Sequence, residues 1–134
     1  MNFELSVNAA ERYVEVIVRS DMTRSLATEV SQRAQQAMRQ HKLAATLIDL
    51  RTSRNVEQAP QNYFFVHEDA SMLELSQSDR IALLVAPEDH SHDFVEMVLR
   101  NAGFSVRLFR DEAAARAWIR ENPESSATID ARDG

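Results

Sequence analysis

The sequence predicts a single α/β domain in the order ββαβαβαβα, with about five strands in a mixed, mostly parallel sheet and about four helices. Short apolar runs typical of strands alternate along the chain with longer segments in which apolar residues recur at helical spacing. The length of 134 residues, with 44% hydrophobic and 27% charged residues, is that of one soluble globular domain. Because strands that alternate with helices usually pair in parallel, we expect a sheet covered by helices.

Two strands open the chain and are expected to form an antiparallel hairpin. Phe3, Leu5 and Val7 alternate with polar residues, which is the period of a half-buried strand. The segment 13–18 reads YVEVIV, and its β-branched and aromatic residues favour a second strand. The polar break between them is short enough for a hairpin connection.

A helix and a buried strand follow the hairpin. Asp21 or Thr23 can cap a helix that runs to about Gln40. Residues 44–50, AATLIDL, form a mostly continuous apolar run, which is typical of a central strand covered on both faces. The apolar residues of the helix recur at helical spacing and are Leu26, Val30, Ala34, Ala37 and Met38.

The middle of the chain predicts another helix and another buried strand. The segment 59–75 is expected to be helical, with Pro60 in its first turn, where the missing N–H costs nothing. Residues 81–85, IALLV, form a buried strand that ends before Pro87.

The next helix is expected to begin near residues 90–92, with Asp89 or Ser91 as its cap. It should end at Gly103, one of only two glycines in the chain, because glycine readily adopts the left-handed conformation that ends helices. A strand is expected at 104–109.

Asp111 is expected to cap the last helix. The domain should span residues 1–122, and residues 123–134 form a polar C-terminal tail. An i, i+3, i+4 stripe on the last helix should face the core and consists of Ala115, Trp118 and Ile119.

The composition excludes several kinds of function. The chain has no cysteine, which excludes disulfides, thiolate metal sites and cysteine nucleophiles. A net charge of −6 disfavours a nucleic-acid partner. No apolar run approaches the roughly 18–20 residues that span a bilayer, and no signal peptide is visible, so we expect a cytoplasmic protein without a membrane span.

Two groups of polar residues lie at or just past the carboxyl ends of predicted strands. His90 and His92, flanked by carboxylates, could bind a divalent metal, and Asp49 in an enzyme could be a base or a metal ligand. The simpler interpretation is that Asp89 or Ser91 caps the next helix, whose N-terminus favours acids, and that Asp49 either bonds nearby backbone amides or pairs with an arginine such as Arg51. We expect no metal, no cofactor and no catalytic residue, and we keep Asp49, Arg51, His90 and His92 as a candidate strand-end ligand site.

Tyr63, Phe64 and Phe65 form an aromatic run within the predicted helix 59–75. Three consecutive residues cannot all face the same way on a helix, so at least one ring should face solvent or a partner. This run is the candidate partner surface. The chain lacks G-x-S-x-G, G-x-x-x-x-G-K-[ST] and G-x-G-x-x-G, and we predict that it is not an enzyme.

The element order, the strand runs LIDLR and RIALLV, and above all NAGFSVRLFRDEAAARAWI resemble the SpoIIAA-like (STAS-type) family of bacterial STAS/CRAL-TRIO-like proteins. The resemblance covers roughly residues 3–120. The family's closing motif is a helix, a glycine, a strand that ends in Phe, and an Asp-capped helix with an Ala and a Trp. In this chain its residues are Gly103, Phe109, Asp111, Ala115 and Trp118.

The resemblance implies a regulatory role, because anti-sigma-factor antagonists of this family bind a kinase-type partner. They are switched by phosphorylation of a serine in a D-S-[ST]-G-like motif at the start of the helix after the central strand. The corresponding residues 55–59, NVEQA, contain neither a hydroxyl nor a glycine, and Thr52 and Ser53 lie too early to match. No phosphorylation site is therefore carried over.

Together these observations predict a non-enzymatic protein-interaction or regulatory module whose partner is another protein or a second copy of the chain. The alternative is a module that binds a small apolar ligand or lipid between helix and sheet, as the resemblance to other relatives implies. An apolar cavity beneath the helices would favour the alternative.

Overall fold

The computed structural model describes residues 2–120, and the predicted tail at 123–134 lies outside the described residues. Within them, five strands form one mixed sheet in the order β1-β2-β3-β4-β5. β1 and β2 form the predicted antiparallel hairpin, and the later strands extend the sheet in parallel. The strands are β1 (Phe3–Asn8), β2 (Tyr13–Val18), β3 (Ala45–Asp49), β4 (Arg80–Leu84) and β5 (Ser105–Phe109). The predicted α/β class, with β3 at the centre, is confirmed.

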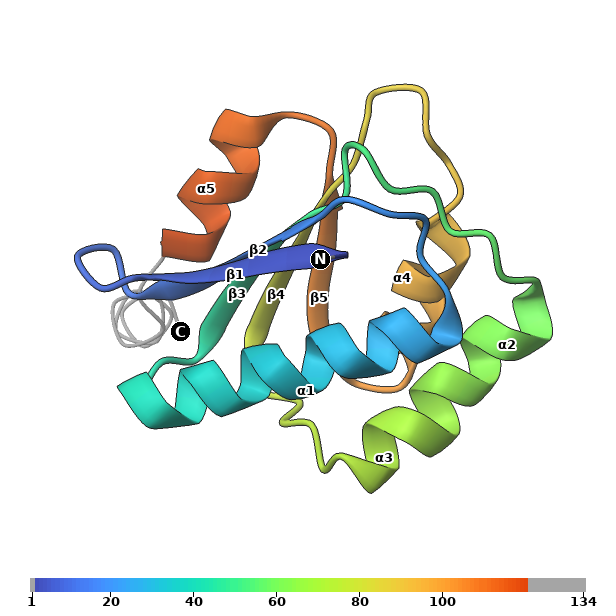
Figure 1. The fold of residues 1–134 in the computed structure, drawn as a ribbon, viewed down its shortest axis with the longest axis horizontal. Helices are drawn as coiled ribbons and strands as arrows, with labels where there is room; N and C mark the ends of the chain where they lie inside the picture. The colour runs from blue at the N-terminus through green and yellow to red at the C-terminus, as the bar shows by residue number, and fades with distance from the viewer. Residues whose placement is uncertain (1, 121–134) are drawn as a thin grey trace, which may run out of the picture.

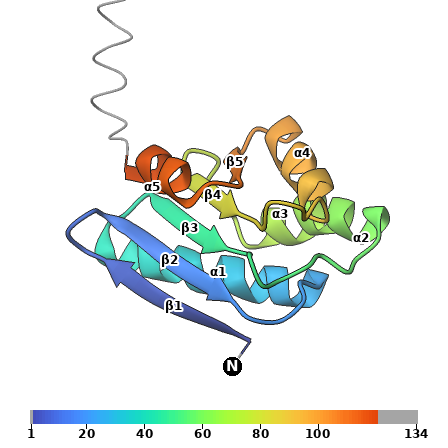
Figure 2. The same ribbon diagram turned by 90° about the horizontal axis from the view of Figure 1, so that it is seen from above.

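Helices cover both faces of the sheet. Figures 1 and 2 show α1 and the α2–α3 segment on one side and α5 on the other. Since the parallel strands follow one another in a single direction, right-handed crossovers place every connecting helix on the same face. The last helix is not a crossover and is free to cover the opposite face. The helical elements are α1 (Arg24–His41), α2 (Ala59–Phe64), η1 (Phe65–Asp69), α3 (Ala70–Met72), α4 (Asp93–Asn101) and α5 (Glu112–Arg120).

The alternation of side chains along the strands produces two cores. On the α1 side the buried set includes Val14, Val16, Val18, Leu26, Val30 and Leu83. On the α5 side it comprises Tyr13, Ala45, Leu47, Ala82, Leu84, Ala115 and Ile119. Both faces of β3 are therefore buried, as its continuous apolar run predicts.

Two of the three predicted helix caps are confirmed. The Leu26 N–H donates to Thr23 Oγ1 (3.1 Å), and the Ala114 N–H donates to Asp111 Oδ2 (3.1 Å). The prediction that Asp89 or Ser91 caps α4 is wrong, because His92 holds the N-cap position. The two side chains instead fix the preceding loop: Asp89 Oδ1 accepts from the Ser91 N–H (2.8 Å), and Ser91 Oγ accepts from the Asn55 N–H (2.9 Å).

The predicted helix 59–75 is present but shorter and irregular. Regular α-helix gives way to the π-helical segment η1 within it, and the helix ends at Met72. Glu74 then adopts a positive φ of 54° and turns the chain back toward β4. A π-helical turn often marks a functional site, because it changes which side chains face the interior.

The stripe predicted on α5 is buried at two of its three positions. Ala115 and Ile119 are fully buried, whereas Trp118 is only half-buried. Its ring lies 5.7 Å from the Phe109 ring, and the Arg80 guanidinium lies 4.3 Å from the Trp118 ring centroid. Trp118 therefore covers the edge of the α5 core rather than filling its centre.

Gly103 has a φ of 96°, as predicted for the residue that ends α4. A Cβ at this position would lie 3.1 Å from Gln77 Nε2, the end of a flexible side chain that can move aside. We therefore expect Gly103→Ala to lower the free energy of unfolding by about 1 kcal/mol, because of backbone strain alone. Urea titration measures the loss. Gly103→Asn should lower the free energy of unfolding by less, since Asn tolerates positive φ. Equal losses of stability in the two variants would contradict the strain argument.

Candidate functional site

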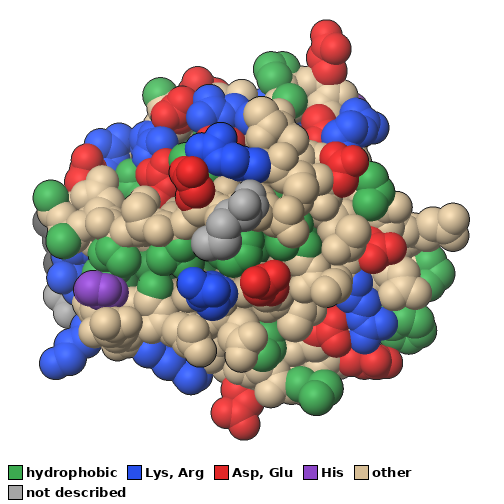
Figure 3. Space-filling model, viewed as in Figure 1, with side chains coloured by type: hydrophobic (Ala, Val, Ile, Leu, Met, Phe, Trp, Pro, Cys, Tyr) green, Lys and Arg blue, Asp and Glu red, His purple; other side chains and the backbone are tan. Residues whose placement is uncertain are grey.

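The three aromatic residues of the predicted partner surface divide between surface and interior. Tyr63 and Phe64 have exposed fractions of 50% and 38%, whereas that of Phe65 is 7%. Figure 3 shows hydrophobic side chains on the surface near α2, with charged side chains around them. Including Phe65 in the partner surface is wrong, because it lies in an interior cluster with Val66 and Val98. The surface that remains, here called the α2 surface, consists of Tyr63 and Phe64.

Arg24 at the start of α1 holds the π-helical segment in place. Its Nε donates to Asp69 Oδ2 (2.7 Å) and its Nη2 donates to Asp69 Oδ1 (3.0 Å). The Thr28 hydroxyl donates to the same carboxylate (3.1 Å). The hydrogen bond from Arg24 holds the pKa of Asp69 below its ordinary value, although burial acts to raise it. The Arg24 guanidinium also lies 5.5 Å from the Phe64 ring, so this cluster joins α1, η1 and the α2 surface.

A cavity of about 120 Å³ lies between α1, the α2–η1–α3 segment, α4 and the sheet, and Arg24 is one of the residues that line it. Most of its wall is apolar and includes Val30, Ile48, Phe65, Leu83 and Leu99. Cavities of about 150 Å³ in other proteins hold benzene, whereas sites for drug-sized ligands begin at about 300 Å³. The cavity is therefore of the size for a single ring or a short chain.

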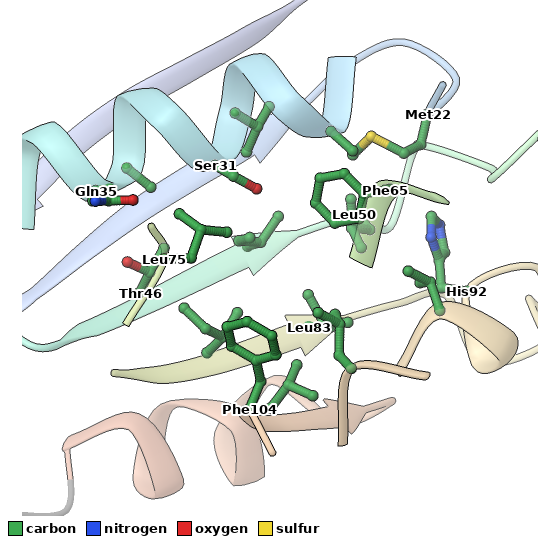
Figure 4. Close-up of a pocket in the computed structure, with 18 of the residues that line it drawn as sticks. Met22, Ser31, Gln35, Thr46, Leu50, Phe65, Leu75, Leu83, His92 and Phe104 are labelled. Carbon is green, nitrogen blue, oxygen red and sulfur yellow. The ribbon is translucent and has the colours of Figure 1, made fainter. Parts of the chain in front are cut away.

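The two ends of the cavity carry polar side chains. Figure 4 shows Gln35 and Thr46 near Leu75 at one end, and His92 at the other end below Met22. Gln35 Oε1 and Thr46 Oγ1 are buried and have no hydrogen-bond partner among the described residues. A buried oxygen without a hydrogen-bond partner costs about 1–3 kcal/mol. A polar ligand group that hydrogen-bonds to these oxygens would recover part of that cost.

Asp49 and Arg51 of the predicted strand-end site form a closed ion pair. Asp49 Oδ2 accepts from Arg51 Nη2 (2.8 Å), and Oδ1 accepts from Arg51 Nε (3.0 Å). Burial acts to raise the pKa of Asp49, but the hydrogen bonds from Arg51 outweigh it and the pKa is lowered. Arg51 also pairs with Glu112 of α5 (3.0 Å). A carboxylate held ionised by an arginine is a weak base. Through Arg51 and Glu112 this pair joins β3 to α5.

His90 and His92 point in different directions. His90 is exposed, and its Nδ1 lies 2.9 Å from Asp93 Oδ2. His92 is buried, and its Nε2 lies 2.8 Å from the Ser53 carbonyl oxygen, which requires that nitrogen to carry the proton. His92 lines the cavity on the α1 side of the sheet, whereas Asp49 contacts α5 on the other side through the Arg51–Glu112 pair. The structure thus does not bring the four candidate residues together.

The polar residues of the cavity were not found from the sequence, although one signal was present. Thr46 is the polar residue inside the otherwise apolar run AATLI, where a hydroxyl must be buried. Gln35 follows Ala34 of the core stripe and gives no such signal, because a glutamine on a helix is usually exposed. Among residues 2–120, no group of three or more His, Asp or Glu side chains is placed to hold a metal ion.

The family-model comparison agrees with the fold. A model of the SpoIIAA-like family matches residues 13–120, which is most of the chain. Comparison with curated proteins and with solved structures gives no match. No helix in the described part of the chain has the length and apolar character needed to cross a membrane. With its closing motif in place and most of its length matched, this chain belongs to the SpoIIAA-like, STAS-type family.

Proposed function

We propose that the protein is a non-enzymatic regulatory module that binds another protein through the α2 surface. The observation that supports it is the exposure of Tyr63 and Phe64 side by side on one helix, next to charged side chains. Aromatic residues beside arginine are typical of the residues that dominate binding energy at interfaces. Membership of the SpoIIAA-like family is consistent with a regulatory domain of the anti-sigma-factor antagonist type.

Regulation of this module would not use the family's serine switch. The helix after β3 begins at Ala59 with Gln58 as its N-cap, and no side chain there caps the helix. Of the nearby hydroxyls, Ser53 is buried, whereas Thr52 is exposed and its Oγ1 donates to the Val18 carbonyl oxygen (3.1 Å). A kinase needs an accessible hydroxyl, so Ser53 cannot replace the missing serine without local opening. Thr52 lies seven residues before the helix that begins at Ala59, and it does not stand at the start of that helix as the family's serine does.

The α2 surface is tested by mutation and binding. The double change Tyr63→Ala with Phe64→Ala should weaken binding of a partner isolated from host extract at least about tenfold, since hot-spot residues exceed that threshold. Met97→Ala on α4 is a matched control, because it also removes an exposed apolar side chain. Dissociation constants from isothermal titration calorimetry give the comparison. Equal affinity of the double variant and the wild type would contradict the proposal.

A second function, binding of a small apolar ligand, is favoured by the cavity. Its wall is mostly apolar, it lies between helices and a sheet, and the π-helical segment forms part of its cover. Small-molecule sites commonly combine such apolar walls with a few polar groups. Binding of single-ring compounds, measured by calorimetry and located by amide chemical-shift changes in β3 and β4, tests this function.

A further inference from the structure

The polar end of the cavity has a specific hydrogen-bonding character. Gln35 Nε2 donates to the Leu73 carbonyl oxygen (3.3 Å), which fixes the orientation of the amide. The reverse orientation would place two oxygens against each other. The Gln35 oxygen, which can only accept, is therefore the atom left without a partner in the described structure.

Thr46 supplies the second group at this end. In the sheet register it lies between Val14 and Ile81, so its hydroxyl has apolar neighbours on both sides. The side chain is fully buried, and Oγ1 has no partner among the described residues. A hydroxyl can both donate and accept a hydrogen bond. Thr46 can therefore pair with a ligand hydroxyl, which has the same two capacities.

The charges near this end disfavour an anionic ligand. Asp79 immediately precedes β4 and lines the cavity. Burial raises the pKa of Asp79 above its ordinary value, with Arg39 acting in the opposite direction. The same burial would penalise the charged form of a ligand carboxylate at this end. Arg24 also lines the cavity, but its guanidinium is held by Asp69.

We propose that this end of the cavity selects a neutral molecule of about benzene's size that carries one hydroxyl group. The ligand hydroxyl donates to Gln35 Oε1 and accepts from the Thr46 hydroxyl, while the ring or chain occupies the apolar part. The inference rests on the ligand-binding function proposed above and adds the chemical class of the ligand.

Phenol and toluene test the inference because they differ by a hydroxyl in place of a methyl group. In a purely apolar cavity toluene binds more tightly, since phenol must give up its hydrogen bonds to water. We expect the wild type to reverse this order and bind phenol about tenfold more tightly than toluene, as two buried oxygens gain partners. Calorimetry supplies the affinities, and amide chemical shifts at Thr46 and Ile81 locate the ligand.

Three variants assign the preference to individual atoms. Thr46→Val keeps the shape of the side chain, should raise the melting temperature by removing an unpartnered hydroxyl, and should restore the preference for toluene. Gln35→Leu should also restore it. Ser31→Ala is the matched control, because it removes a hydroxyl from another part of the cavity wall and should keep the preference for phenol.

The outcomes separate the two proposals. If neither compound binds, the ligand-binding function itself is wrong. If both bind but the wild type prefers toluene, the cavity binds ligands and the hydroxyl inference is wrong. If Ser31→Ala abolishes the preference and Thr46→Val does not, the assignment to Thr46 is overturned.

Discussion

Phe65→Ala should lower the free energy of unfolding by about 3–5 kcal/mol, which is the usual cost of removing a buried phenylalanine ring. Phe65 lies in the interior cluster with Val66 and Val98 and also forms part of the cavity wall. Truncation therefore joins new empty space to an existing cavity, and the surrounding helices can collapse only partly. Urea unfolding measures the loss, with the fluorescence of the sole tryptophan as signal.

Phe64→Ala is the matched control, since it makes the same chemical change one residue earlier. Phe64 is exposed, and its ring contacts the Arg24 guanidinium and, edge to face, the Tyr63 ring. The loss of free energy of unfolding in Phe64→Ala should therefore stay within about 1 kcal/mol. Saturating benzene should recover part of the stability of Phe65→Ala by occupying the enlarged cavity. A similar loss of free energy of unfolding in Phe64→Ala and Phe65→Ala would show that Phe65 is not the buried residue and Phe64 the exposed one.

The contrast between these neighbours shows what hydrophobic periodicity can predict. The sequence requires that the three aromatic residues face different ways, but it does not say which one turns inward. Their sides depend on the π-helical segment that starts at Phe65, and the spacing of 59–75 gives no sign of it. The hairpin, the central strand and Gly103 were predictable because local backbone preference and burial indicate the same structure there.

The candidate site was less predictable, because it depends on contacts between distant residues. Asp49 and Arg51 are close in sequence, and their pairing was expected from spacing. Gln35 and Thr46 share a cavity only because α1 packs over β3. The contact between Arg24 and Asp69 spans 45 residues and has no local signal. Tertiary packing, rather than any motif, brings these groups together.

Asp69→Asn should lower the free energy of unfolding by about 2 kcal/mol at neutral pH, because it removes the charge from a largely buried carboxylate that accepts three hydrogen bonds. Only 16% of this side chain is exposed. The segment η1 should then open more often, so hydrogen exchange at its amides should accelerate while the amides of β3 change less.

The pH dependence separates loss of charge from loss of packing. Because the folded-state pKa of Asp69 is lowered, its contribution is fully present above the unfolded-state value of about 3.9 and is lost as pH falls through the folded-state pKa. The difference between wild type and Asp69→Asn should thus stay constant from neutral pH to about pH 5 and shrink in more acidic solution. Glu68→Gln is the matched control: this neighbour contacts the same arginine at 3.3 Å, but its side chain is 57% exposed, and its loss should stay within about 0.5 kcal/mol. A difference for Asp69→Asn that persists unchanged well below its folded-state pKa would show that the carboxylate charge does not hold η1 on α1.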